Sequence, residues 1–131
     1  MGEGAMSWQL MVGIALAGVL GTLCRWGIAL LPWWGTSFPW ATLAVNLLGS
    51  FCTGVFWAWA QGRLPQLLPW LPVVFVGFLG AFTTFSTCML DSANLLLAGR
   101  PIRFLLYALL QGGGGISCVI GGILLGRWLA S

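Results

Sequence analysis

Four long apolar runs, separated by short segments rich in proline and glycine, dominate the pattern along the chain. They lie at Trp8–Trp34, Pro39–Ala60, Trp70–Ala98 and Phe104–Leu129. Each run reaches or exceeds the roughly 20 residues that a helix needs to cross a bilayer core. We therefore expect an all-α membrane protein with one four-span domain over residues 1–131. Because Glu3 stands where a signal peptide would be basic, we expect no cleaved signal.

The third run is longer than a straight span requires. A helix of this length either tilts strongly or is interrupted. The stretch Gly80–Thr84 is the place where a break would fall, because glycine and β-branched threonine favour the helix less than alanine does. Carbonyls freed at a break need a partner other than lipid. The sequence predicts a third helix broken near Gly80–Thr84.

Polar residues form stripes at helical spacing in three of the four runs. The stripes are Thr42, Asn46, Ser50 and Thr53; Thr84, Thr87 and Asp91, with Phe85 and Cys88 beside them; and Tyr107, Gln111 and Gly115. Such side chains either join helices to one another or line a polar path. The amide of Asn46 and the hydroxyl cluster from Thr83 to Thr87 exceed what packing requires, which favours a path.

Composition indicates the sign of the charge that this path would carry. Only 5% of the residues are charged and 60% are hydrophobic, against about a quarter charged in a soluble domain. No acidic residue lies in the middle of a run, Asp91 is near the end of the third, Arg25 lies in the first, and the net charge is +3. Hydroxyl and amide donors, positive aromatic edges and a nearby cation favour an anion. A proton-coupled exporter would instead need a carboxylate in its path.

Small residues recur at four-residue spacing in the second and fourth runs. They are Ser50, Gly54 and Ala58, and Gly114, Cys118, Gly122 and Gly126. This spacing predicts close helix packing. The cysteines, one in each run, show no C-x-x-C pairing, so we expect them to pack as small apolar residues and not to form disulfides or a zinc site.

The arginines divide almost evenly between the two sides of the membrane. With four spans, Arg63 and Arg127 lie on one side, and Arg100 and Arg103 on the other, with Arg25 nearest to the second pair. An excess of basic residues on one side is what orients a membrane protein. A near tie therefore predicts insertion in both orientations and an antiparallel dual-topology homodimer.

Three motifs carry a resemblance to a known family. "GTLCRW", "ATLAVNLLGSF" and "GFLGAFTTFSTC" occur in this order in the first three runs, and they resemble the signatures of the Fluc/CrcB fluoride channels, small four-span bacterial proteins. The resemblance covers essentially the whole chain. It implies passive efflux of fluoride through a multi-pass protein of the bacterial inner membrane, with no enzymatic activity and no nucleic-acid partner. It also implies an antiparallel homodimer with a structural sodium ion (Na+) at its interface.

The resemblance further implies which residues form the sites. Asn46 is similar to the family's pore-lining asparagine, and Phe85 to the aromatic residue whose ring edge faces fluoride. The full fluoride set is Asn46, Phe85, Cys88, Thr42, Ser86, Thr87, Tyr107 and Arg25, with Arg25 near the pore entrance. The backbone carbonyls of Gly80 and Thr83 are similar to the sodium ligands.

The chain departs from the family pattern at several positions. Cys88 stands where a second phenylalanine is usual, Ala81 replaces a glycine, Asp91 a glutamate and Gly115 a serine. Cys88 leaves open whether a homodimer conducts with Phe85 alone or a related subunit supplies the missing ring; the retained polar residues favour the homodimer. The four-span pattern by itself is also compatible with a coupled exporter of a small solute or a non-transporting packing subunit.

Overall fold

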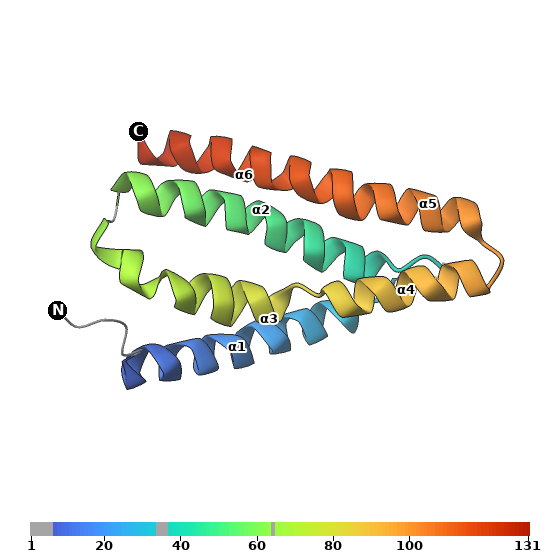
Figure 1. Ribbon diagram of the computed structural model, residues 1–131, viewed down its shortest axis with the longest axis horizontal. Coiled ribbons are helices and arrows are strands. Elements are labelled where there is room, and N and C mark those ends of the chain that lie inside the picture. Colours follow the sequence, from blue (N-terminus) through green and yellow to red (C-terminus); the bar gives the residue numbers. More distant parts are fainter. Residues whose placement is uncertain (1–6, 34–36, 64) are drawn as a thin grey trace.

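The chain is almost entirely helical over the residues that the computed structural model describes, 7–33, 37–63 and 65–131 (Figure 1). Within these residues, four helices are long and apolar enough to cross a membrane: Trp8–Ala29, Trp40–Gly62, Gln66–Leu97 and Pro101–Ala130. The four-span prediction is confirmed, and the chain is a multi-pass membrane protein. Two residues used in the sequence predictions lie outside the described residues. They are Glu3, from which no cleaved signal was expected, and Trp34, at the end of the first apolar run.

Two spans are single helices and two are composite. The first and second spans are α1 (Trp8–Ala29) and α2 (Trp40–Arg63). The third consists of a 3₁₀ segment (Pro65–Trp70), a π-helical segment (Val73–Leu79), α3 (Gly80–Phe82) and α4 (Phe85–Leu97). The fourth consists of α5 (Pro101–Leu109), a π-helical segment (Leu110–Gly114) and α6 (Gly115–Ala130).

The ends of the helices follow from local chemistry. Helix α1 ends at Ala29, earlier than the apolar run suggested, because Leu31 precedes Pro32 and a residue before proline avoids the helical conformation. Between α4 and α5 the chain reverses in a tight turn. Gly99 has a φ of +68°, a conformation that glycine adopts without strain, and Pro101 then begins α5.

The spans pack in neighbouring pairs (Figure 1). Helix α6 lies along α2, α1 lies along the first half of the third span, and α4 contacts α5. Helix α1 begins and α6 ends at the same end of the molecule. The close contact between α2 and α6 depends on glycine: a Cβ on Gly54 would collide with the carbonyl of Val119, and a Cβ on Gly122 with that of Phe51. The predicted close packing is therefore confirmed for this pair.

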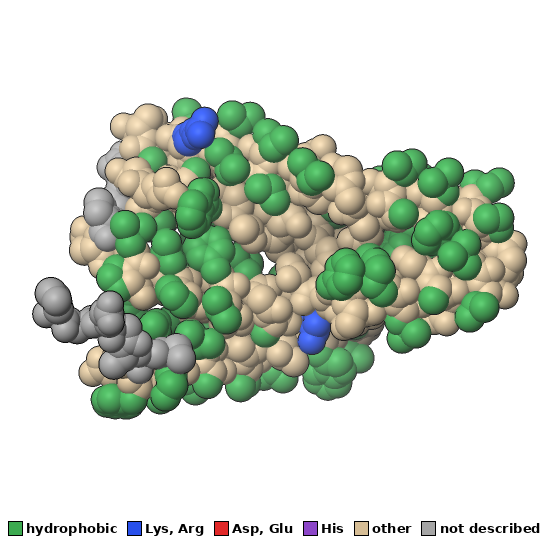
Figure 2. All heavy atoms as spheres, viewed as in Figure 1, with side chains coloured by type: hydrophobic (Ala, Val, Ile, Leu, Met, Phe, Trp, Pro, Cys, Tyr) green, Lys and Arg blue, Asp and Glu red, His purple; other side chains and the backbone are tan. Residues whose placement is uncertain are grey.

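The buried core of the single chain is small. One cluster of it contains Leu43, Cys88, Leu95 and Tyr107, from α2, α4 and α5, and the other buried hydrophobic residues are Val45, Ala60, Leu79 and Phe82. Most large apolar side chains are exposed on the surface of the molecule. Figure 2 shows hydrophobic side chains across the whole visible face, with small isolated patches of basic side chains and no acidic ones. Such a surface suits contact with lipid or with another apolar protein surface.

Candidate functional site at the break in the third span

The third span is interrupted near its middle by two extended residues. Thr83 has φ −80° and ψ 162°, and Thr84 has φ −149° and ψ 118°. Helix α4 then begins at Phe85, with Thr84 as its N-cap: the Thr87 amide donates to Thr84 Oγ1 at 3.2 Å. The predicted break is confirmed, and it falls at the last two residues of the predicted stretch.

The break removes the usual helical donors of the backbone carbonyls just before it, including those of Gly80 and Thr83. In a continuous helix the amide of Thr84 would donate to the carbonyl of Gly80, and that of Thr87 to the carbonyl of Thr83. The Thr84 amide instead donates to Asn46 Oδ1 at 2.8 Å, and the Thr87 amide to Thr84 Oγ1. The carbonyls of Gly80 and Thr83 therefore lose their normal helical donors in the middle of a membrane span.

Asn46 of α2 replaces the missing helical hydrogen bonds at the break. Its Oδ1 accepts from the Thr84 amide, and its Nδ2 donates to the Thr84 carbonyl at 3.0 Å. These two bonds together fix the orientation of the Asn46 amide. Its second N–H donates to Gln111 Oε1 at 3.2 Å. Both N–H groups of Asn46 thus have acceptors within the chain in this conformation.

A chain of hydrogen bonds extends from Asn46 through the fourth span. Gln111 Nε2 donates to the Tyr107 hydroxyl at 2.9 Å, and this hydroxyl donates to Asp91 Oδ2 at 3.2 Å. An ionised carboxylate only accepts hydrogen bonds, so Asp91 sets the direction of the Tyr107 hydroxyl. The hydroxyl in turn accepts from Gln111, which leaves the Gln111 carbonyl oxygen facing Asn46.

Two clefts meet at the break. The first, here the break cleft, has a volume of about 340 Å³ and is lined by Asn46, Ser50, Thr53, Thr83, Thr84, Phe85, Gln111 and Val119. The second, the arginine cleft, has a volume of about 420 Å³ and is lined by Thr22, Leu23, Arg25, Trp26, Ala29, Ala41, Thr42, Val45, Thr84 and Thr87. Thr84 lines both. Their polar side chains are hydroxyls, amides and one guanidinium, and no carboxylate is among the lining residues.

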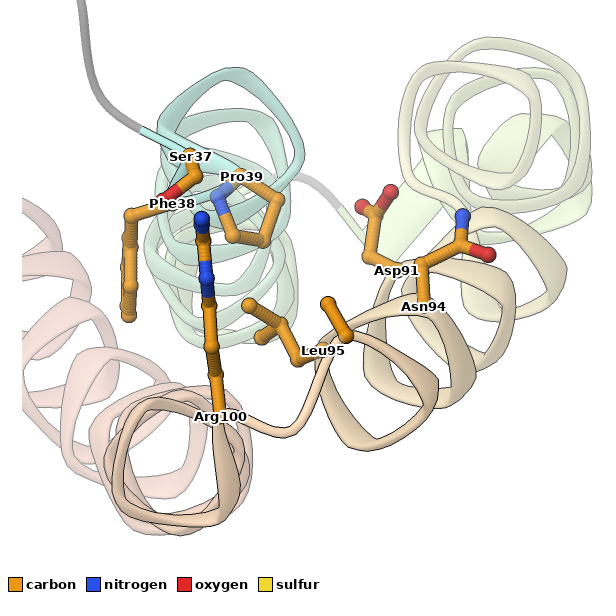
Figure 3. Close-up of a pocket in the computed structure, with 8 residues that line it drawn as sticks. Ser37, Phe38, Pro39, Asp91, Asn94, Leu95 and Arg100 are labelled. Carbon is orange, nitrogen blue, oxygen red and sulfur yellow. The ribbon is translucent and has the colours of Figure 1, made fainter.

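A third pocket, here the end pocket, lies where α4 turns into α5. Its volume is about 310 Å³, and it is lined by Ser37, Phe38, Pro39, Asp91, Asn94, Leu95, Ala98 and Arg100. In Figure 3, Asp91 lies on one side of this pocket, and Arg100 extends from the other side toward Ser37. The carboxylate of Asp91 therefore joins the end pocket to the hydrogen-bond chain that leads to the break cleft.

The structure brings most of the residues implied by the motifs to the break. Asn46 and Phe85 line the break cleft, and the Phe85 side chain is 77% exposed. Thr42, Thr87 and Arg25 line the arginine cleft. The polar stripe of α2 is therefore divided between the two clefts. Thr42 lines the arginine cleft, and Asn46, Ser50 and Thr53 line the break cleft.

The remaining residues of that set lie elsewhere. Ser86 is exposed on the first turn of α4 and lines neither cleft. Tyr107 is fully buried and reaches the break cleft only through Gln111. Cys88 is 6% exposed and packs with Leu43 and Tyr107 in the core. The structure thus places Cys88 behind the cleft wall, whereas the motif comparison implied a lining position.

One residue of the site, Gln111, and one contact, between Arg25 and Thr83, were not predicted from the sequence. Gln111 lines the break cleft and bonds Asn46; its position four residues after Tyr107 was a signal for it. The link between Arg25 Nη1 and the Thr83 carbonyl, at 3.4 Å, had no such signal, because the two residues belong to different spans. This contact brings a positive charge to the break.

The atoms that could hold a cation here are backbone oxygens. Among the described residues, no group of three or more His, Cys, Asp or Glu side chains could hold a metal ion. Uncharged carbonyl oxygens are ligands that suit a hard cation. The carbonyls of Gly80 and Thr83, which the break separates from their helical donors, are oxygens of this kind, and that of Thr83 also accepts from Arg25 Nη1.

Comparison with known proteins agrees with this arrangement. Residues 12–123 match the family model described as CrcB-like protein, Camphor Resistance (CrcB). The chain belongs to the CrcB family. The CrcB match includes the break, both clefts' lining residues and the Asn46–Gln111 pair.

Relatives of the chain carry the name "Fluoride-specific ion channel FluC". One from Xanthomonas euvesicatoria pv. vesicatoria is 35% identical over 126 residues, which is 95% of each chain. One from Nitrosococcus oceani is 40% identical over 114 residues, 86% of this chain and 91% of the relative. One from Magnetococcus marinus is 47% identical over 90 residues, 66% and 72% of the two chains.

Proposed function

We propose that this CrcB-family protein is a fluoride-selective channel that lets fluoride leave the cytoplasm down its electrochemical gradient and so reduces fluoride toxicity. The observation that carries the proposal is the broken third span, which exposes hydroxyl and amide donors to a cleft lined by no carboxylate. A small, strongly hydrated anion crosses a membrane only where such donors replace its water. The names of the relatives point to the same ion.

We place the channel in the inner membrane of a bacterium as an antiparallel homodimer. In a single chain the break cleft is open at the surface, and Phe85 beside it is 77% exposed. Irregular backbone at membrane depth is tolerated only when it is covered by protein or faces water. A second copy in the opposite orientation covers the cleft, and the near tie of arginines across the membrane allows that orientation.

We further propose that a sodium ion holds the two copies together through the Gly80 and Thr83 carbonyls of each. These carbonyls have lost their helical donors, and two copies supply more oxygen ligands than one. Replacing sodium by potassium or by a large organic cation should lower the thermal stability of the dimer and slow fluoride release. Unchanged stability and flux after rigorous sodium removal would assign these carbonyls another partner.

Ion flux from liposomes tests the proposed function. Purified protein is reconstituted into vesicles loaded with potassium fluoride or potassium chloride, and efflux is started with valinomycin under a potassium gradient. Fluoride should leave the vesicles and chloride should remain. Because no other protein is present, fluoride release would also show that the homodimer conducts without a related subunit.

The same assay separates a channel from an exporter and from a packing subunit. Fluoride movement that requires a proton gradient would indicate a coupled exporter. Absence of flux from folded, dimeric protein would contradict the proposal and favour a packing subunit. Flux that appears only after a related subunit is added would replace the homodimer by a heterodimer.

A further inference from the structure

The second N–H of the Asn46 amide points into the break cleft. Two bonds to the backbone of Thr84 fix this amide, so its remaining N–H has one direction, into the break cleft. There it meets Gln111 Oε1 at 3.2 Å. An anion in this cleft that accepts a hydrogen bond from Asn46 must therefore take the place of the Gln111 oxygen.

The orientation of Gln111 is also set by its surroundings. Its Nε2 donates to the Tyr107 hydroxyl, which is committed to Asp91 as a donor. Rotating the Gln111 amide by half a turn would place its NH₂ group against the NH₂ group of Asn46, donor against donor. The carbonyl oxygen of Gln111 thus faces Asn46 while the Tyr107 hydroxyl donates to Asp91.

We propose that Gln111 is an exchange acceptor for the permeating anion. It satisfies the Asn46 N–H while the cleft holds no ion, and it gives up this bond when an anion arrives. This inference rests on the proposed function, since it concerns the same path. Asn46 is half-buried in one chain, and the second copy of the proposed dimer covers its cleft. A buried N–H without an acceptor costs about 1–3 kcal/mol, so an anion entering such an unpaired site would bind more tightly and leave more slowly.

The benefit of this arrangement is weak binding. Conduction requires that an ion bind well enough to enter the pore and weakly enough to leave it. Because one acceptor replaces another at Asn46, its N–H is paired before the anion enters the cleft. For the same reason the anion is not bound too tightly once it is there. Gln111 therefore sets the affinity of the cleft, while the Asn46–Thr84 pair sets its geometry.

Two substitutions at Gln111 should shift affinity in opposite directions. Gln111→Met keeps the length of the side chain and removes the acceptor, so the fluoride concentration that half-saturates the initial flux should fall about fivefold, the equivalent of roughly one neutral hydrogen bond, and the maximal flux should fall with it. Gln111→Glu strengthens the acceptor and adds a negative charge, so half-saturation should move to a higher concentration. The measurement is initial fluoride flux against fluoride concentration in the reconstituted dimer.

Gln61 offers a matched control, because it is an exposed glutamine on the far part of α2. Gln61→Met and Gln61→Glu make the same chemical changes away from the cleft and should leave half-saturation unchanged. Tyr107→Phe removes the hydroxyl that orients Gln111 and should shift half-saturation in the same direction as Gln111→Met, by a smaller factor. Dimer content and thermal unfolding of each variant are measured in parallel.

The outcomes separate this inference from the proposed function. A parent protein that releases no fluoride contradicts the function itself. A parent that releases fluoride, with Gln111→Met and Gln111→Glu both changing flux at constant half-saturation, overturns the inference and leaves the function standing. Opposite shifts in half-saturation, absent at Gln61, support Gln111 as the exchange acceptor.

Discussion

At the scale of single residues, Asn46 has two roles that a sequence motif cannot separate. Its amide closes the backbone at the break through Thr84, and the same NH₂ group presents a donor to the break cleft through Gln111. The first role stabilises the fold, and in the proposed channel the second faces the ion. A substitution at Asn46 therefore affects both stability and transport.

Asn46→Asp should abolish fluoride flux and destabilise the protein. A carboxylate cannot donate to the Thr84 carbonyl or to Gln111, and each acceptor left unpaired costs on the order of 1–3 kcal/mol; its charge also repels an anion. Fluoride flux and thermal unfolding measure the two effects. Gln61→Glu, which makes the same amide-to-carboxylate change at an exposed position of α2, is the control for stability. An Asn46→Asp protein with parental flux would remove Asn46 from the ion's path.

Cys88 is the second residue to consider at this scale: the motif implied a pore-lining position, and the structure places it in the core. It packs in the core at 6% exposure, so Cys88→Phe should overpack this region and reduce the free energy of unfolding by about 1–3 kcal/mol. Thermal unfolding checks this, with Cys24→Phe on the exposed face of α1 as control. A Cys88→Phe variant with parental stability and faster fluoride flux would show that the side chain points into the pore.

At the scale of elements, the contact between α2 and α6 fixes the position of the polar residues on α2. The two backbones approach so closely that Gly54 and Gly122 leave no room for a Cβ. This approach places Gln111, at the start of the fourth span's π-helical segment, within reach of Asn46. The cleft therefore depends on glycines that do not line it.

Gly122→Ala should separate α2 from α6. The added Cβ would meet the backbone carbonyl of Phe51, and backbone cannot move aside as a flexible side chain does, so we expect a loss of about 1–3 kcal/mol of stability together with reduced flux. Gly112→Ala is the matched control, because a Cβ there has open space around it; it should be neutral or stabilising by about 0.5–1 kcal/mol. Equal stability of the two variants would contradict this account of the helix contact.

At the scale of the whole molecule, the distribution of charge bears on the proposed antiparallel assembly. Arg63 and Arg127 belong to one side of the membrane, and Arg100 and Arg103 to the other, with Arg25 nearest to the second pair. This near tie gives little preference for either orientation. An antiparallel pair needs both orientations in one membrane. The small difference in charge between the two sides thus allows the second, oppositely oriented copy that would cover the break cleft.

A short run of lysines added after Ser131 should force a single orientation and abolish fluoride flux, because only parallel pairs could then form. Orientation is measured by the accessibility of a tag at the C-terminus, and flux by the liposome assay. The same number of glutamines added at this position is the control and should leave flux intact. Parental flux from a uniformly oriented population would refute the antiparallel dimer.

The sequence alone determined the four spans, the interruption of the third and the donor-rich, acid-poor character of the site. These follow from local properties: the length of apolar runs, the low helix preference of "GAFTT", and residue types at helical spacing. The motifs also pointed to Asn46, Phe85 and Arg25, which the structure brings to the break.

Only the tertiary structure decided which atoms meet. The pairing of Asn46 with the Thr84 backbone, the contact of Arg25 with the Thr83 carbonyl and the burial of Cys88 all join residues from different spans. Periodicity assigns a residue to a face of its own helix, but it carries no information about the rotation of one helix against another. Close approaches at glycines help to set this rotation: Gly21 and Gly77 leave no room for a Cβ between α1 and the third span, and Gly49 leaves none between α2 and Thr83. The division between cleft wall and core therefore became visible only in the folded chain.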